Sequence, residues 1–250
     1  MVVIEHLQKS FGDNRVLDDV NLTLNDGEIL SIIGMSGIGK SVLLKVIVGL
    51  VEPDGGKVYL DDMDITDLSE NEFNDHVRSQ ISMVFQQGAL WDSLTVQENI
   101  DLALAVRHNL SKPERDALIH ESLELVGLRD ADNLYPEELS GGMIKRASIA
   151  RAIAARPKYL FYDEPTTGLD PVLANMVNDL IIKLHRELHT TSLVVSHDIA
   201  HLQRISQRVA LLHGGRIAHI CEAGEMWNQE NRIFNSFIRG ELDVLYENKT

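Results

Sequence analysis

Two kinds of residue are scarce in this 250-residue chain: cysteine and, relative to the acidic residues, the basic residues. The single cysteine, Cys221, has no partner for an internal disulfide, which excludes a disulfide framework and indicates a reducing compartment. Lys and Arg number 23 against 38 Asp and Glu, so the formal net charge is −15. This surplus of negative charge disfavours sequence-independent binding to nucleic acid and a polybasic contact with anionic lipid. Composition alone therefore predicts an acidic protein that avoids phosphates.

Long apolar runs are also missing. The longest, at 29–33, 46–51 and 159–162, are far shorter than the roughly 20 residues that cross a bilayer. The start, MVVIEHLQKSF, places Glu5 and His6 where a signal peptide needs an unbroken apolar stretch. We therefore expect any membrane role to come through a partner protein.

Apolar patterns alternate between short strands and helices along most of the chain. The expected strands are 2–7, 16–24, 28–33, 57–60, 81–85, 158–162, 192–196, 209–213 and 216–221, and the expected helices are 41–50, 141–155, 171–188 and 199–205. Between about 96 and 129, leucines among charged residues favour helices, and Ser111 with Pro113 fits the start of one. Gly214-Gly215 signals a hairpin. The pattern predicts an α/β fold with a mostly parallel sheet, interrupted by a helical insert at 93–156.

Residues 34–41 read GMSGIGKS and match the phosphate-binding pattern G-x-x-x-x-G-K-[ST]. The glycines let backbone N–H groups wrap around an anion without a Cβ in the way, and the loop opens a helix whose N-terminus favours negative charge. Lys40 is expected to reach the β- and γ-phosphates of a nucleotide, and the Ser41 hydroxyl to ligate Mg²⁺. The alternative is a glycine-rich turn that happens to carry a lysine. The apolar strand before the loop and the helix pattern after it favour nucleotide binding.

A second motif, YLFYDE at 159–164, ends a buried apolar strand in two acids. Asp163 is expected to hold Mg²⁺ through water. Glu164 is expected to orient and activate the attacking water as a general base. The alternative is a strand end with solubilising acids, which the pairing with the glycine loop disfavours.

Residues 1–225, which contain these two motifs, resemble the ATP-binding-cassette (ABC) ATPases. The distinguishing LSGGQ motif of that family has its counterpart in LSGGM at 139–143. There Ser140 and two glycines start a predicted helix, whose N-terminus offers another place for a phosphate. In the family this motif faces the ATP held by the opposite subunit, so the resemblance implies that two copies pair to build two sites. Without the other motifs, LSGGM would be an N-capped helix.

Four further residues match the family by position. Phe11 would stack on adenine, although alone it would more often be a core residue. Gln86, in MVFQQ, would sense Mg²⁺ and the transport partner, although an ordinary polar strand end is the alternative. His197, in VVSHD, would contact the γ-phosphate, although a lone histidine at a strand end is usually structural. Asp170, in TTGLDP, would communicate across the dimer while also capping the helix that follows.

The resemblance thus implies an enzyme that hydrolyses ATP, with ATP and Mg²⁺ as cofactors. The implied catalytic residues are Glu164, His197, Lys40 and Gln86. The implied nucleotide-binding residues are Phe11, Gly34, Met35, Ser36, Gly37, Ile38, Gly39, Lys40, Ser41, Val42, Ser140, Gly141, Gly142 and Asp170. The implied metal-binding residues are Ser41, Gln86 and Asp163.

Two positions depart from the family pattern. Val42 stands where Thr is usual, and Met143 stands where the signature usually has Gln. Neither position supplies the catalytic base, so we expect activity to survive. Both features, with the stretches 87–100, 141–152 and 162–171, are similar to the subgroup that energises Mla/Mce-type lipid transport. The resemblance therefore implies phospholipid or lipid transport. An ABC importer ATPase for another small solute is the alternative, and a non-transport ABC ATPase is a more distant one.

The resemblance also implies an architecture and an assembly. The fold would be a P-loop NTPase (RecA-like) core at 1–92 and 157–224, with an antiparallel β subdomain and an α-helical signature subdomain at 93–156. The implied partners are a second ATPase subunit in a homodimer, an integral membrane permease whose coupling helix docks near Gln86, and an Mce-domain lipid-binding protein, with no nucleic acid. The chain would then be cytoplasmic and peripheral on the inner membrane through the permease.

The C-terminal tail, 225–250, follows the predicted core. Ile233, Phe234, Phe237 and Ile238 form an apolar helical stripe in it. Packing on its own domain is the commoner outcome for such a stripe, and docking on the partner subunit is the competing hypothesis.

Overall fold

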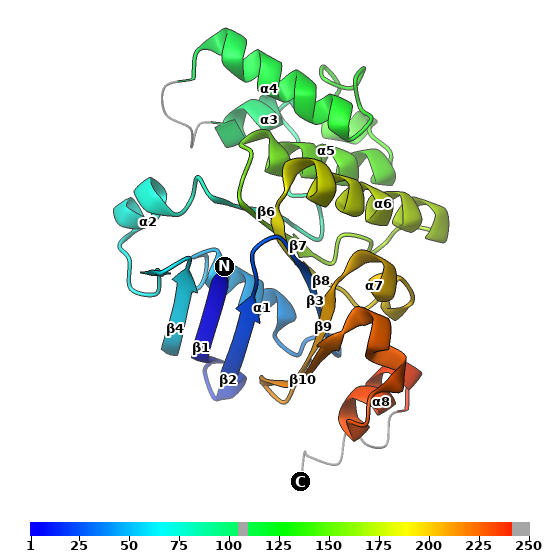
Figure 1. Cartoon of the computed structure of the whole chain (residues 1–250). Coiled ribbons are helices and arrows are strands. Elements are labelled where there is room, and N and C mark those ends of the chain that lie inside the picture. Colours follow the sequence, from blue (N-terminus) through cyan, green and yellow to red (C-terminus); the bar gives the residue numbers. More distant parts are fainter. Residues whose placement is uncertain (105–109, 242–250) are drawn as a thin grey trace. The chain divides into compact units, whose positions relative to one another are not determined.

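The structure is a computed structural model that describes residues 1–104 and 110–241 (Figure 1). The predicted α/β fold class is confirmed, because helices alternate with the strands of two sheets as in a P-loop NTPase. The chain divides into two compact units: Met1–Asp67 with the C-terminal part from Leu193 onwards, and Leu68–Ser192. The subdomain boundaries expected from the sequence stay predictions. Parts of the expected helical insert (105–109) and of the expected tail (242–250) lie outside the described residues.

The elements agree closely with the alternation in the sequence. The strands are β1 (Val2–Phe11), β2 (Asn14–Leu24), β3 (Ile29–Ile33), β4 (Gly55–Leu60), β5 (Met63–Asp64), β6 (Ile81–Val84), β7 (Tyr159–Asp163), β8 (Thr191–Val195), β9 (Arg208–His213) and β10 (Arg216–Glu222). The helices are α1 (Lys40–Ile47), α2 (Glu70–His76), α3 (Val96–Leu104), α4 (Lys112–Leu125), α5 (Gly141–Ala154), α6 (Pro171–Leu188), α7 (Ile199–Ile205) and α8 (Arg232–Arg239), with the 3-10 helices η1 (Pro136–Glu138) and η2 (Ala223–Asn228).

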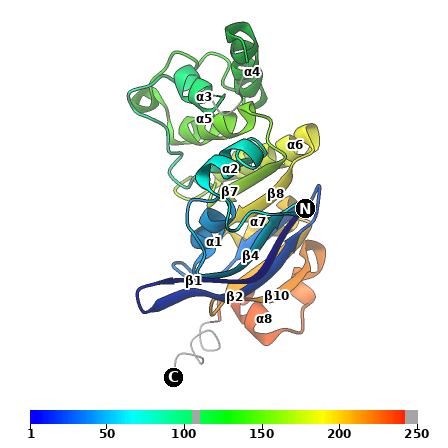
Figure 2. The same ribbon diagram turned by 90° about the vertical axis from the view of Figure 1, so that its left-hand side faces the viewer.

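An antiparallel sheet with the strand order β2-β1-β4-β5 lies in the first unit (Figure 2). Apolar side chains on one face of its long strands are fully buried, among them Leu7, Leu17 and Val20. Polar residues occupy many of the positions between them, which is the pattern of a sheet with one face on the core. Irregular register between Ile4 and Leu7 interrupts the alternation of β1.

The other sheet has the strand order β10-β9-β3-β8-β7-β6. Strands β3, β7 and β8 are buried at every position, as continuous apolar strands covered on both faces should be. Strand β3 pairs with β9, and β6 pairs with β7, in parallel. Strands β9 and β10 form the antiparallel hairpin that Gly214-Gly215 predicted.

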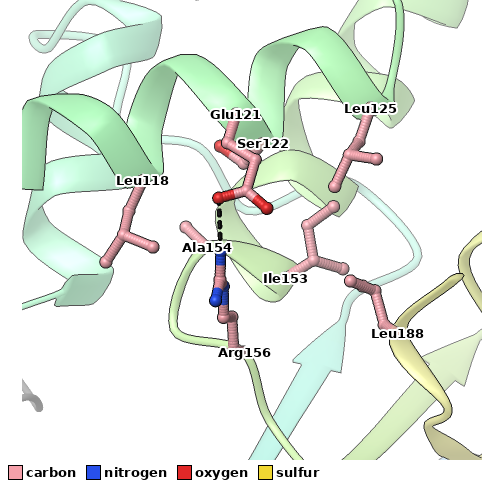
Figure 3. A pocket seen from close by; sticks show the side chains of 8 residues that line it. All are labelled: Leu118, Glu121, Ser122, Leu125, Ile153, Ala154, Arg156 and Leu188. Atoms are coloured by element: carbon pink, nitrogen blue, oxygen red, sulfur yellow. Dashed lines mark hydrogen bonds and ion pairs between the residues drawn. The ribbon is translucent and has the colours of Figure 1, made fainter.

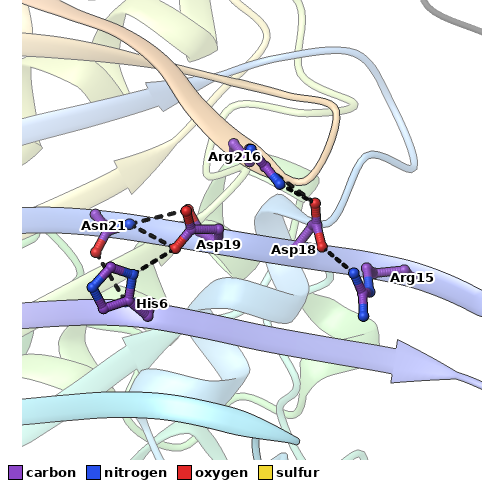
Figure 4. A network of polar contacts seen from close by, with 6 residues as sticks. All are labelled: His6, Arg15, Asp18, Asp19, Asn21 and Arg216. Carbon is purple, nitrogen blue, oxygen red and sulfur yellow. Dashed lines mark hydrogen bonds and ion pairs between the residues drawn. The ribbon is translucent and has the colours of Figure 1, made fainter.

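Within the first unit, an ion-pair network joins β2 to the β9–β10 hairpin (Figure 4). The carboxylate of Asp18 accepts hydrogen bonds from Arg216, with Nη2 to Oδ2 at 2.7 Å, and from Arg15. These guanidinium groups, Arg216 foremost, lower the pKa of Asp18 below its ordinary value. The backbone N–H of Asp18 also donates to the Gly215 carbonyl at 2.9 Å. The hairpin is therefore fastened to the antiparallel sheet by backbone and side chain together.

In the second unit, α5 packs against both α3 and α4 (Figure 1). Helix α4 starts with the predicted cap, since Ser111 and Glu114 form a reciprocal capping box. Helix α2 was not expected, although Ser69 and Glu72 carry the same S-x-x-E signal in the sequence. Across the described part of the chain, no helix is both long and apolar enough to span a membrane.

Helix α8 packs on its own unit. Phe234 and Ile238 are buried in a core cluster with Ala223 and Met226, and Phe237 is partly buried against it. The amphipathic stripe of the tail therefore does what such stripes do most often, which is to cover the core of its own domain. The hypothesis that the tail docks on a partner subunit stays a prediction for the residues after α8. Of these, 242–250 lie outside the described residues.

Candidate nucleotide-binding site

The glycine loop lies between the buried strand β3 and helix α1 in the first unit. Gly34 and Gly39 have positive φ angles of 156° and 110°. A Cβ on Gly34 would lie 2.6 Å from the Leu212 carbonyl oxygen, and a Cβ on Gly39 would lie 2.6 Å from Cγ1 of Val16. Backbone conformation and close packing both require glycine at these two positions. At Gly37, in contrast, a Cβ would meet nothing within 4 Å, so the middle of the loop borders open space.

The side chain of Lys40 folds back over this loop. Its Nζ donates to the carbonyl oxygens of Gly34 at 2.8 Å and Met35 at 2.9 Å, and the residue is 5% exposed. Burying an ammonium group is costly unless it is hydrogen-bonded, and these charge-assisted bonds supply that compensation. Helix α1 begins at Lys40 itself, without a side-chain cap and without an acidic residue in its first turn. Positive charge and the N-terminus of a helix therefore coincide at the loop.

Two more predicted residues belong to the first unit. Phe11 ends β1 and is 51% exposed, so the alternative of a core phenylalanine is wrong. Its exposed ring is able to stack on a planar ligand. His197 follows β8 and is exposed, and its carbonyl oxygen accepts a hydrogen bond from the N–H of Ile199 at the start of α7.

The acids of the second motif end strand β7 in the second unit. Asp163 is 5% exposed, which is rare for a carboxylate. Glu164 adopts the left-handed conformation with φ 50°, which is uncommon outside glycine and concentrates at functional sites. Its Oε2 accepts a hydrogen bond of 2.6 Å from Oγ1 of Thr167. The carboxylate of Glu164 is thereby held in one orientation.

The signature and the residue predicted to communicate across a dimer are both helix caps in this unit. Ser140 caps α5 through its hydroxyl, which accepts from the N–H of Met143, and Asp170 caps α6 by accepting from the N–H groups of Val172 and Leu173. A Cβ on Gly142 would lie 3.0 Å from Leu173, so this glycine lets the start of α5 pack closely on α6. Ser140 and Asp170 are exposed, and the prediction that each caps a helix is confirmed.

Sequence reasoning missed two cations of α5. Lys145 is 6% exposed and its Nζ donates to the backbone carbonyl of Gln86, while Arg151 donates to the carbonyls of Gly88, at 3.0 Å, and Ala89. Burial lowers the pKa of Lys145, and the negative charges of Asp163 and Glu164 oppose that effect. The sequence signal for Lys145 was the basic pair in IKR, at 144–146, directly after LSGGM.

The predicted site residues thus fall into two groups, one in each unit. Phe11, the loop at 34–42 and His197 belong to the first unit, and Gln86, Ser140–Gly142, Asp163, Glu164 and Asp170 belong to the second. A small apolar hollow in the second unit, lined by Leu118, Leu125, Ile153 and Leu188 and crossed by the ion pair of Arg156 with Glu121, contains none of them (Figure 3).

Each of the two groups offers donors that suit part of a magnesium nucleotide. Backbone N–H groups of a glycine loop, the ammonium of Lys40 and a helix N-terminus suit phosphate oxygens. The Ser41 hydroxyl and the Asp163 carboxylate are hard oxygen ligands of the kind that Mg²⁺ prefers. The exposed ring of Phe11 suits a base.

Comparison with known proteins agrees with this chemistry. Residues 17–167 match the sequence profile of the family described as ABC transporter. The methionine import ATP-binding protein MetN of Rhizobium johnstonii is 41% identical over 96% of this chain and 66% of its own length. The intermembrane phospholipid transport system ATP-binding protein MlaF of Haemophilus influenzae is 36% identical over 97% of this chain and 92% of its own length. The chain therefore spans just under two thirds of the MetN relative.

A solved structure is similar over most of this chain. The ATP-binding cassette MJ0796, a dimer in a post-hydrolysis state bound to ADP and Pi, superposes with a TM-score of 0.81 at 34% sequence identity. The match covers 89% of this chain and 99% of that one.

Proposed function

This chain belongs to the ABC transporter family, and from that premise we propose that it is the ATP-hydrolysing subunit of a transporter for phospholipid or a related lipid. The observation that carries the ATPase assignment is the glycine loop with the buried Lys40 folded over it at the start of α1. Lipid is supported by the alignment with MlaF, which extends over 92% of that protein, whereas the match with MetN covers only 66% of MetN. Val42 and Met143 support the same subgroup.

Nucleotide binding is assigned to the first group of residues. The ring of Phe11 stacks on adenine, and the N–H groups of residues 34–42 with Lys40 bind the phosphates. Ser41 and Asp163, with Gln86, are the residues that would hold Mg²⁺, which when bound neutralises charge on the β- and γ-phosphate oxygens.

Hydrolysis is assigned to Glu164 and its neighbours. Glu164 accepts a proton from the attacking water, and Thr167 holds the carboxylate in place for that task. His197 contacts the γ-phosphate. The start of α5 at Ser140–Gly142 faces the nucleotide of a second copy of the chain, and Asp170 communicates across that dimer. The chemistry is positioning and electrostatic stabilisation more than covalent catalysis.

The proposal includes an assembly. Two copies pair, a membrane permease docks near Gln86, and an Mce-domain protein is a further partner. The chain is then cytoplasmic and bound to the inner membrane through the permease. The net charge of −15 suits a subunit that contacts neither nucleic acid nor anionic lipid directly.

Methionine or another small solute is the second candidate cargo. It is favoured by the 41% identity to MetN, which exceeds the 36% identity to MlaF. Because the cassette does not touch the cargo, both candidates share one nucleotide site.

The test is transport by the assembled complex. The tagged chain is purified with its permease from host membranes, and the complex is reconstituted in vesicles that contain labelled phospholipid. We expect ATP-dependent transport of the labelled phospholipid, and we expect a complex carrying Glu164→Gln to be inactive.

The outcomes separate the two parts of the proposal. ATP-dependent accumulation of labelled methionine without phospholipid movement would support the second candidate and overturn the lipid assignment. A complex that binds its permease but releases no phosphate from ATP would overturn the ATPase assignment.

A further inference from the structure

Helix α5 carries a buried cation at the end of strand β6. Lys145 is 6% exposed, and its ammonium donates to the carbonyl of Gln86, 59 residues away in the chain. We propose that Lys145 is a positioning residue for ATP hydrolysis, which holds the segment at Gln86 against the signature helix. This inference rests on the proposed ATPase function.

Burying the ammonium group of Lys145 costs free energy that some interaction must offset. A buried ammonium loses its hydration, and one carbonyl contact compensates that loss only in part. The ammonium donates to the Gln86 carbonyl, so the hydrogen bond between them fixes the Gln86 segment to α5.

The same helix holds the rest of the segment. Arg151 donates to the carbonyls of Gly88 and Ala89. A Cβ on Gly88 would lie 3.0 Å from Cγ2 of Ile144, which shows how closely this turn lies on α5. Two cations and one tight contact along α5 therefore fix residues 86–89 to that helix.

The far end of the segment is fastened to α3. The side chain of the fully buried Asn99 donates to the carbonyls of Trp91, Leu94 and Thr95, at 3.0 to 3.1 Å, and accepts from the N–H of Trp91 at 2.7 Å. Trp91 lies in this segment, between the contacts with α5 and those with α3, and it is 61% exposed. A displacement of the exposed segment is thus transmitted to α5, and α5 begins at Ser140–Gly142.

The chain offers a matched control for Lys145. Lys183 of α6 also donates to a backbone carbonyl in the same unit, that of Leu125 at 3.0 Å, but it is exposed. K145M removes charge and donor while keeping most of the volume, K183M does the same at the control position, and K145R keeps both properties.

Steady-state ATP hydrolysis by the full chain is the first readout. We expect K145M to lower kcat by about tenfold or more with KM for ATP within about twofold of wild type. K145R should recover most of kcat, and K183M should match wild type. A merely structural lysine would change stability without this split, so unfolding midpoints are measured alongside.

Hydrogen exchange in the nucleotide-free protein is the second readout. We expect faster exchange at residues 86–95 in K145M and no change there in K183M. Unchanged kcat and unchanged exchange in K145M would overturn the inference. If K145M does not fold, K145Q replaces it with the same two readouts.

The two proposals fail in different ways. A wild-type chain without ATPase activity contradicts the proposed function. Even then, equal exchange at 86–95 in wild type and K145M would still overturn the tether.

Discussion

At the scale of single residues, the glycines of the phosphate loop differ in the space that surrounds them. Gly37 and Gly39 both have positive φ angles, 76° and 110°. Gly39 lies against Val16 and Leu17 of β2, whereas Gly37 borders open space. Gly37 is therefore needed only because the backbone has a positive φ angle there. Gly39 is needed for that reason and also because a side chain would not fit.

Substituting alanine at Gly37 and at Gly39 should distinguish the effect of backbone conformation from the effect of packing. We expect Gly39→Ala to lower the free energy of unfolding by about 1–3 kcal/mol more than Gly37→Ala, because only the former drives a methyl group into Val16. Urea denaturation measures the difference. Equal losses in the two variants would contradict the packing argument.

Asp170 and Ser140 show that two readings of one residue need not exclude each other. Each caps a helix through its side chain, and each stays exposed at the position that the family resemblance assigns to contacts with a second copy. A capping side chain is held in one place by the helix it caps, and such a fixed group is well suited to a precise contact.

At the scale of elements, α8 is a short helix that completes the core of the first unit. Phe234 is fully buried and its ring lies edge-on to that of His219, with centroids 5.0 Å apart. Phe237, one turn later, is only partly buried. The helix begins at a cap formed by Asn231 and ends at Gly240 in the left-handed conformation.

Truncation of these two phenylalanines should therefore differ in cost. We expect Phe234→Ala to destabilise the protein by about 3–5 kcal/mol, as is typical of a buried phenylalanine, and Phe237→Ala by clearly less. Thermal and urea unfolding measure both. A larger loss at Phe237, or a loss of self-association at normal stability, would instead indicate that α8 serves a partner.

At the scale of the whole molecule, the net charge of −15 coexists with a site suited to phosphates. The loop offers an anion backbone N–H groups, a helix N-terminus and one buried lysine, and none of these requires a basic chain. Composition was therefore misleading about phosphates, and its prediction that the chain avoids nucleic acid stays a prediction.

The proposed pairing of two chains around ATP has a direct test. Glu164→Gln should bind ATP with Mg²⁺, lose at least about a hundredfold in turnover and accumulate as a dimer, because hydrolysis normally reopens it. Light scattering after size exclusion measures the mass. Lys40→Ala, which removes a proposed phosphate contact, is the matched control and should bind no ATP by calorimetry and stay monomeric. Undiminished hydrolysis by Glu164→Gln would exclude its role as the base.

The sequence by itself determined the residue types of the site and most of the elements. GMSGIGKS and YLFYDE are local patterns, because a phosphate loop and a strand end depend on neighbours along the chain. For the same reason Ser111, Pro171 and Gly214-Gly215 predicted two helix starts and a hairpin that the structure contains. Helix α2 was missed although its capping signal is just as local.

Only the tertiary structure decided which residues support that site. Lys145 and Gln86 are 59 residues apart, Arg151 and Ala89 are 62 apart, and these bonds end on backbone carbonyls, which every residue type provides. A sequence motif cannot show which backbone carbonyl a side chain will reach, because every residue carries one. The exposure of Phe11 and the burial of Phe234 were likewise decided by packing, since both are phenylalanines in amphipathic surroundings and differ in what folds against them.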